Sequence, residues 1–316
     1  MASLRILYVT DLHGSRKSFL KFLKALKIYK ANVGILGGDL TGKLIVPIMK
    51  QEDGTSVTEF MGRKYIIDSE TSLNTVKTMI TDSGYYPFMA SKDEIQKLSI
   101  DSQFSNDTFK HLAAERLTEW NQLAKPRLDG TGIKVYITGG NDDYLEFDDV
   151  LMASESMIFV ESRLETLEGG HEMISTGYAN MTPWKCPRDV TEEELYARIE
   201  NLAKQVTDLK SAIFNLHAPP IDSALDQCTK LDASVDPPRA LIGQQYSGGS
   251  AAVRKAIETF QPLISLHGHI HESRGLDKIG RTLCFNPGSE YAEGVLRSVL
   301  VSLGKEKVES YQFLSG

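Results

Sequence analysis

The sequence has no long run of apolar residues. Its longest apolar stretches, such as residues 6–9 and 299–303, fall far short of the roughly 20 residues that cross a bilayer. Residues 1–10 also lack the basic start, apolar stretch and small-residue cleavage site of a secretory signal. We therefore expect a cytoplasmic protein without a transmembrane helix or a membrane partner.

Cysteine is scarce. The chain contains 3 cysteines, Cys186, Cys228 and Cys284, and no two of them have the close spacing of a C-x-x-C pair. This pattern predicts neither a disulfide framework nor a thiolate zinc site. We expect reduced, unreactive thiols.

Positive charge is also in short supply, since 35 Lys and Arg face 42 Asp and Glu, for a formal net charge of -7. Nucleic-acid binding normally requires clustered excess Lys and Arg, so DNA or RNA is an unlikely partner. The remaining composition, 41% hydrophobic and 24% charged, is typical of a globular protein. It does not define an oligomeric state.

What the sequence does contain is a repeated pattern of apolar strand, polar cluster and helix. Ser15 is a predicted N-cap for a helix with an apolar stripe from Phe19 to Leu26. Further helical stripes cover residues 195–209 and 253–260. The strands are expected at residues 5–10, 31–36, 135–138, 157–160, 212–216 and 263–266. This alternation predicts an α/β fold.

Residues 43–132 interrupt the alternation. They contain predicted strands at 44–50 and 57–67, followed by predicted helices at 69–82, 91–98 and 107–125. A segment of this length is too long for a loop, so we interpret it as an inserted cap or lid within a single domain spanning residues 1–316. Strands expected at 281–285 and 296–303 fit a second sheet.

Polar side chains that can bind a metal ion follow several of the strands. In α/β sheets ligands bind at the carboxyl ends of strands, where separate loops converge. A mixed set of Asp, Asn and His side chains suits Mn, Fe, Co, Ni or Zn and leaves the metal's identity open. The candidate metal ligands are Asp11, His13, Asp39, Asn141, His217, His269 and His271.

The order of these clusters along the chain is Asp-x-His, Gly-Asp, Gly-Asn, a lone His and Gly-His-x-His. This order resembles the calcineurin-like metallophosphoesterase superfamily. The resemblance implies a four-layer fold, a two-sheet β-sandwich flanked by helices. It also implies that Asp39 bridges two divalent ions, one held by Asp11, His13 and His271 and the other by Asn141, His217 and His269.

The chemistry that the resemblance implies is metal-dependent hydrolysis of a small phosphate-ester substrate. Two ions roughly 3.5 to 4 Å apart would bind the phosphate oxygens and hold a hydroxide for in-line attack. No protein nucleophile is needed, and the sequence has no G-x-S-x-G nucleophile elbow. The predicted catalytic residues are Asp39, Asn141 and Asp142.

Asp142 departs from the family pattern, in which a histidine that protonates the leaving group follows the metal-binding Asn. An ionised Asp142 would repel a dianionic monoester more than a monoanionic diester, so we expect a phosphodiesterase. The other interpretation is that Asp142 forms a turn or a hydrogen bond to His13 or His269.

Several alternatives remain open from the sequence. The enzyme could be a phosphomonoesterase or phosphoprotein phosphatase, and the chain could also be a non-catalytic metal-binding scaffold for protein interactions. Residues 85–88 and Trp120 could stack on a nucleotide base or fill a small core, with the core favoured. His267 is interpreted as structural, and His111 and His171 as surface residues.

Overall fold

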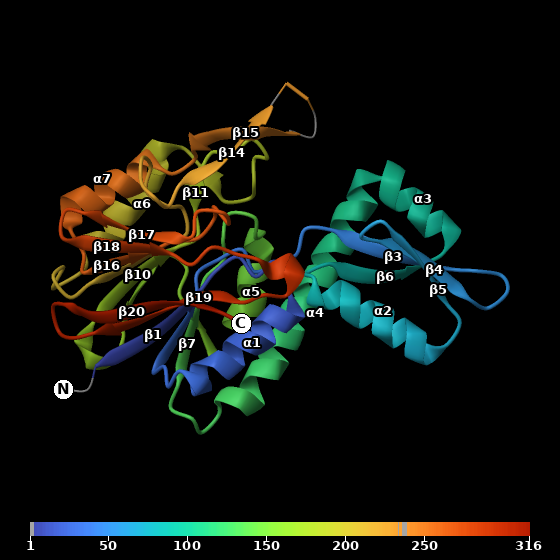
Figure 1. Cartoon of the computed structure of the whole chain (residues 1–316), viewed down its shortest axis with the longest axis horizontal. Coiled ribbons are helices and arrows are strands. Elements are labelled where there is room, and N and C mark those ends of the chain that lie inside the picture. Colours follow the sequence, from blue (N-terminus) through green and yellow to red (C-terminus); the bar gives the residue numbers. More distant parts are fainter. Residues whose placement is uncertain (1–2, 233, 236–238) are drawn as a thin grey trace.

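Two six-stranded sheets pack face to face in a computed structural model that describes residues 3–232, 234–235 and 239–316 (Figure 1). In spatial order, the strands of the first sheet are β20 (Val308–Ser315), β19 (Arg297–Leu303), β1 (Leu4–Val9), β2 (Val33–Leu36), β7 (Lys134–Ile137) and β8 (Met157–Phe159). Strands β1, β2, β7 and β8 run parallel, and β19 and β20 extend the β1 edge antiparallel.

The second sheet is also parallel at its centre. In spatial order, its strands are β17 (Gly275–Ile279), β18 (Thr282–Asn286), β16 (Ile264–Leu266), β13 (Ile213–Leu216), β10 (Glu172–Thr176) and β9 (Arg163–Thr166). Strands β10, β13, β16 and β18 are parallel neighbours. The carboxyl ends of parallel strands in one sheet lie at one rim, which is where the predicted ligands follow their strands.

Helices cover the outer face of each sheet. The helices are α1 (Arg16–Ile28), α2 (Glu70–Asp82), α3 (Lys92–Ile100), α4 (Ser102–Leu128), α5 (Asp148–Met152), α6 (Glu192–Ala203) and α7 (Ala251–Phe260), with 3-10 turns at Leu145–Phe147, Glu168–Gly170 and Tyr291–Glu293. Helices α1, α4 and α5 contribute to one core against the first sheet, and α6 and α7 to another against the second. As predicted, the Ser15 side chain caps α1 by accepting a hydrogen bond from the Ser18 amide.

The apolar runs form strands because both of their faces are buried. Along β1, Ile6 and Tyr8 belong to the core between the two sheets, whereas Leu7 and Val9 belong to the core under α1 and α4. Side chains alternate along a strand, so a strand covered on both faces is a continuous apolar run. The predicted two-sheet β-sandwich flanked by helices is confirmed.

The segment after Gly38 and Asp39 forms a separate small sheet with its own core (Figure 1). Its strands, in spatial order, are β5 (Arg63–Ile67), β4 (Ser56–Phe60), β3 (Ile45–Lys50) and β6 (Tyr86–Ala90). Helices α2 and α3 contact this sheet, and α4 leads the chain back to the sandwich and packs in its core. There the Trp120 ring stacks on Phe19 with centroids 4.3 Å apart, so Trp120 is a core residue.

Several features of the fold differ from the sequence prediction, which did not include strands β6, β9, β10, β17 and β20. Strand β6 contains Pro87, which has no amide hydrogen to donate. The proline is tolerated because β6 lies at the edge of its sheet, where one side of the strand has no neighbouring strand to bond. A hairpin of β14 (Gln227–Asp232) and β15 (Arg239–Ser247) was not predicted, nor was the short pair of β11 (Ala179–Asn180) and β12 (Asp189–Val190). Helix α6 ends at Ala203, but Val206 and Leu209 beyond it pack on the same core, which extends the apolar stripe past the helix.

None of the helices in the described part of the chain combines the length and hydrophobicity of a membrane-spanning segment.

Candidate metal centre

The seven predicted ligands lie just beyond the carboxyl ends of parallel strands in the two sheets. Asp11 and His13 follow β1, Asp39 follows β2 and Asn141 follows β7. His217 follows β13, and His269 and His271 follow β16. The seven side chains converge at one rim of the sandwich and form two groups that share Asp39.

The first group contains Asp11, His13, Asp39 and His271, whose ligand atoms lie within 4.8 Å of one another. His13 Nε2 is 3.1 Å from His271 Nε2 and 3.6 Å from Asp39 Oδ2. Asp11 Oδ1 is 3.5 Å from His271 Nε2. Two imidazole nitrogens and two carboxylates facing a common point are a suitable ligand set for a divalent transition metal.

The second group contains Asp39, His217 and His269. Asp39 Oδ1 lies 3.3 Å from His217 Nε2, so the two oxygens of one carboxylate face different groups. Asn141 joins the second group through its Oδ1, 2.9 Å from His269 Nδ1. Its amide is oriented by Asp189, whose Oδ1 accepts from Asn141 Nδ2 at 3.0 Å. The sequence analysis did not identify Asp189.

Hydrogen bonds behind the rings fix which histidine nitrogens face the centre. His217 Nδ1 donates to the Gly37 carbonyl at 2.9 Å, and His13 Nδ1 donates to the Thr41 carbonyl at 3.2 Å. In the neutral rings, Nε2 of each is then a lone-pair donor pointing at carboxylates. His217 Nε2 is buried without a hydrogen-bond partner. A divalent cation between these atoms satisfies them all, so the residues fit the implied metals.

The pKa values of the buried groups also indicate that the carboxylates of this centre need positive charge beside them. Burial alone would lower the pKa of His217, but the adjacent Asp39 and Asp11 carboxylates raise it. Burial would raise the pKa of Asp11, but its hydrogen bond with His271 and the other histidines hold it well below its usual range. Buried carboxylates that stay ionised require positive charge beside them.

Backbone strain is concentrated at the same residues. Asp11, His13, Asp39 and His269 have φ angles of 55°, 40°, 49° and 65°. Each non-glycine residue in this left-handed region costs of order 1–3 kcal/mol, and such residues persist where the surrounding structure holds them for function. The loops therefore keep four ligands in place against their local preference.

Asp143 braces two of the ligand loops. Its carboxylate accepts hydrogen bonds from the Leu40 and Thr41 amides at 2.9 Å and from the Gly140 amide at 2.8 Å. These bonds fix the positions of the two loops, and so of Asp39 and Asn141, relative to each other. Ser289 supports the centre in a similar way, since its hydroxyl donates to the Asp11 carbonyl at 2.6 Å.

Known proteins resemble the chain mainly in fold. No family model matches it. A curated relative, an uncharacterized protein of Methanocaldococcus jannaschii, is 32% identical over 157 residues, which are 49% of this chain. The chain spans 64% of the length of that relative.

Two solved structures are similar over nearly the whole chain. One crystal structure has a TM-score of 0.60 at 13% identity, and the alignment covers 98% of this chain and 98% of that one. The structure of TT1561 from Thermus thermophilus has a TM-score of 0.53 at 14% identity and covers 100% of this chain and 99% of its own. At such identities the similarity shows the fold alone.

The sandwich carries the five ligand clusters at one rim, in the order that the sequence resemblance implied. The fold is the two-sheet sandwich flanked by helices that the resemblance implied. Solved structures with weaker similarity to it include a dimetal phosphatase from Danio rerio, at a TM-score of 0.44 and 6% identity, which adds nothing about activity.

Asp142 lies in a turn, and its side chain has other partners than the histidines considered from the sequence. The alternative interpretation, a turn or a hydrogen bond to His13 or His269, is correct for the turn and wrong for the hydrogen bond. Its Oδ2 lies 2.8 Å from Lys43 Nζ, and its Oδ1 accepts from the Cys186 thiol at 2.8 Å. Burial would raise the pKa of Asp142, but the Lys43 ammonium holds it well below its usual range. Asp142 is therefore an ionised hydrogen-bond acceptor.

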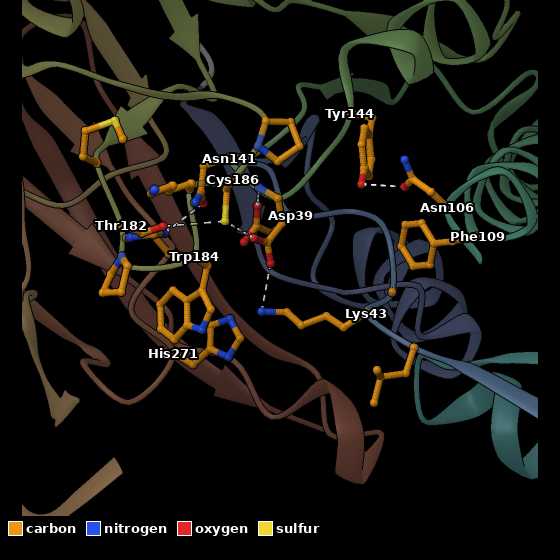
Figure 2. Close-up of a pocket in the computed structure, with 18 of the residues that line it drawn as sticks. Asp39, Lys43, Asn106, Phe109, Asn141, Tyr144, Thr182, Trp184, Cys186 and His271 are labelled. Carbon is orange, nitrogen blue, oxygen red and sulfur yellow. Dashed lines mark hydrogen bonds and ion pairs between the residues drawn. The ribbon is translucent and has the colours of Figure 1, made fainter. Parts of the chain in front are cut away.

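Lys43 and Cys186 are site residues that the sequence analysis missed. Figure 2 shows Lys43 reaching toward the carboxylates around Asp39, while Cys186 approaches from the other side. A lysine at the start of an insertion and a cysteine without a cysteine partner carry no distinctive sequence signal. Cys186 remains a thiol, as expected, and burial beside Asp142 raises its pKa above the ordinary value.

The other three histidines, His111, His171 and His267, lie outside the two groups. His267 is buried and its Nδ1 is 2.9 Å from the Leu216 carbonyl, which agrees with a structural role. His111 is exposed on α4, as predicted. The prediction of a surface position for His171 is wrong, because its ring is buried and Nδ1 donates to the Ser211 carbonyl at 2.7 Å.

A cavity of about 1740 Å³ opens beside the metal centre. One wall comes from the inserted segment and includes Leu44 and Ile100. The opposite wall comes from the loop between β11 and β12 and includes Met181 and Trp184. The ligands Asp39, Asn141, His269 and His271 form part of the lining between the walls. A bound substrate can therefore contact both walls and the metal centre at once.

Replacing Gly140 with alanine is expected to disrupt the metal centre. A Cβ at this position would lie 2.1 Å from both the amide nitrogen and Oδ1 of Asp39, so the Asp39 loop must move. We expect the affinity for metal to fall at least about tenfold, by analogy with residues that orient ligands. The free energy of unfolding should fall by about 1–3 kcal/mol.

Metal content by mass spectrometry and thermal unfolding measure these two effects. Gly275→Ala is the matched control, because its Cβ would have no neighbour closer than 3.5 Å. Retention of normal metal affinity in Gly140→Ala would show that the close approach of these loops is unimportant.

Proposed function

We propose that the chain is a metal-dependent phosphoric ester hydrolase of the calcineurin-like superfamily that acts on small phosphate esters. The observation that supports this most is Asp39, whose two carboxylate oxygens face two separate groups of imidazole nitrogens. One carboxylate between two such groups suits a pair of ions that share a ligand. A binding scaffold has no evident need for this arrangement.

The residues of the chain have distinct tasks in this hydrolysis. Asp39 and Asn141 orient the two groups toward each other, and the hydrogen bonds behind His13 and His217 keep their Nε2 lone pairs available. Two bound divalent ions supply the positive charge that neutralises the phosphate oxygens and activates water. The cavity walls orient the organic groups of the ester.

The proposed substrate class is phosphodiesters. Lys43 offsets the repulsion that the sequence alone attributed to Asp142, so the charge of Asp142 no longer distinguishes the substrates. The preference rests instead on the two walls, which expose apolar side chains on both sides of the centre. The exposed fractions are 58% for Leu44, 73% for Ile100, 53% for Met181 and 57% for Trp184. A diester has an organic group for each wall, whereas a monoester has only one.

The preference is measured with bis(4-nitrophenyl) phosphate and 4-nitrophenyl phosphate, each assayed with manganese. A second aryl group that buries about 60 Å² of apolar surface contributes about 1.4 kcal/mol. We therefore expect kcat/KM for the diester to be at least about tenfold higher.

The other outcomes identify the alternatives. Faster hydrolysis of the monoester would make the chain a phosphomonoesterase. Tight metal binding without hydrolysis of any ester, including nucleotide and glycerol phosphodiesters, would make it a protein-interaction scaffold. As a control, Ile242→Ala removes a side chain that is 97% exposed and does not line the cavity.

A further inference from the structure

Lys43 is held at the junction between the metal-centre loop and the inserted segment. Its neighbour Gly42 donates its amide hydrogen to the Tyr86 hydroxyl at 2.7 Å. A Cβ on Gly42 would lie 2.0 Å from the Gly84 carbonyl oxygen, so only glycine fits here. Thr41, two residues before Lys43, is bonded to Asp143 through its amide and its hydroxyl. The two residues that precede Lys43 are therefore anchored, one to the metal-centre loops and the other to the inserted segment.

The side chain of Lys43 is directed by Asp142. The Asp142 amide donates to Asp39 Oδ1 at 3.1 Å, which ties its backbone to the proposed bridging carboxylate. Of the two carboxylate oxygens of Asp142, one accepts from Cys186 and the other pairs with Lys43. Asp142 thus has no proton to donate to a leaving group, and its carboxylate can act only as an acceptor.

The Lys43 ammonium retains hydrogen-bonding capacity toward the cavity. An ammonium has three N–H donors. In the described part of the chain its one ion-pair partner is Asp142, and 48% of the Lys43 side chain is exposed in the wall of the cavity. Burial would lower the pKa of Lys43, but Asp142 raises it above the ordinary value, so the group remains an ammonium at neutral pH.

We propose that Lys43 donates a hydrogen bond to the leaving-group oxygen of the phosphate ester, and that Asp142 positions Lys43 for this contact. The inference rests on the proposed function. As the bond between phosphorus and the leaving oxygen breaks, its electron pair stays on that oxygen, which the ammonium stabilises. Water supplies the new oxygen on phosphorus; one of its protons reaches the leaving alkoxide through solvent, and the other goes with the product phosphate or to solvent. Lys43 keeps its own protons and its charge.

This role makes Lys43 a catalytic residue and predicts a dependence on the leaving group. A nitrophenolate is stable as an anion and needs little help, whereas an alkoxide needs a donor. Lys43→Met is expected to lower kcat by about 100- to 1,000-fold for an alkyl leaving group, the loss typical of one such donor. For 4-nitrophenyl esters the loss should be less than about tenfold.

The experiment measures kcat and KM for a series of phosphodiesters whose leaving groups run from 4-nitrophenol through phenol to methanol. Lys43→Arg should recover part of the rate with poor leaving groups, because the guanidinium is also a charged donor. Asp142→Asn should give a smaller loss with the same trend, as a positioning residue would. Lys278→Met is the matched control, since Lys278 is an exposed lysine on β17 that does not line the cavity.

The outcomes separate this inference from the proposed function. Wild-type activity alone decides the function, and an inactive wild type overturns both. If the wild type is active, an equal loss for all leaving groups in Lys43→Met shows that Lys43 merely binds phosphate. An unchanged rate shows that it has no role. Either result overturns the inference, provided that the variant retains the wild-type metal content.

Discussion

Replacing Asp39 with alanine is expected to lower hydrolysis by at least about 1,000-fold, since loss of even a single charge-stabilising donor commonly costs about 100- to 1,000-fold. Asp39 is the one predicted ligand whose side chain belongs to both groups of the centre. Without it, each group loses a carboxylate and the two groups are no longer linked. We therefore expect the variant to retain neither ion at concentrations that saturate the wild type.

Metal stoichiometry makes this test specific. Asn141→Ala and His217→Ala should each retain about one ion per chain, because they alter only the second group. Asp53→Ala is the matched control, since it removes an exposed carboxylate in the turn between β3 and β4. Two ions bound to Asp39→Ala would contradict the shared-ligand arrangement, whatever the activity.

Removal of metal by a chelator is expected to abolish activity and to lower the thermal stability. Without cations, the buried carboxylates of Asp11 and Asp39 face His217 Nε2, which has no hydrogen-bond partner. An ion present at 100 times its Kd stabilises the folded state by about 2.7 kcal/mol. Two such ions correspond to a Tm lower by on the order of 10 °C in the chelated protein.

Differential scanning calorimetry and an ester assay measure the two consequences together. Readdition of Mn, Fe, Co, Ni or Zn in turn should restore both, and the ion that restores activity at the lowest concentration identifies the preferred metal. An unchanged Tm and an unchanged rate after exhaustive chelation would exclude a metal centre. Asp39→Ala serves as the internal control, because its Tm should not respond to the chelator.

The parts of the molecule that follow from local sequence were predictable. Strand β1 could be recognised because both of its faces are buried, which leaves a continuous apolar run. Asp11 and His217 could be proposed as ligands because each directly follows such a strand, and parallel strands end at a common rim. The structure does bring the seven proposed side chains together.

The parts that depend on contacts between distant segments were not predictable. Asp142 pairs with Lys43 and accepts a hydrogen bond from Cys186, and both partners come from other segments of the chain. No spacing in the sequence indicates these contacts. His171 is buried because its ring reaches a carbonyl 40 residues away, although its Gly-Gly neighbourhood is typical of an exposed turn. Strand β6 was obscured by its proline, which is permitted because the strand lies at the edge of its sheet.

The inserted segment is attached to the sandwich at both of its ends. The segment leaves the sandwich next to Leu40 and Thr41, whose amides are bonded to Asp143, and it returns through the helix that carries Trp120 onto Phe19. Swinging the segment outward would break those bonds and pull on Asp39. The segment is thus tied at its start to the loop that carries Asp39 and at its end to the core of the sandwich, so a displacement of the segment would also displace Asp39.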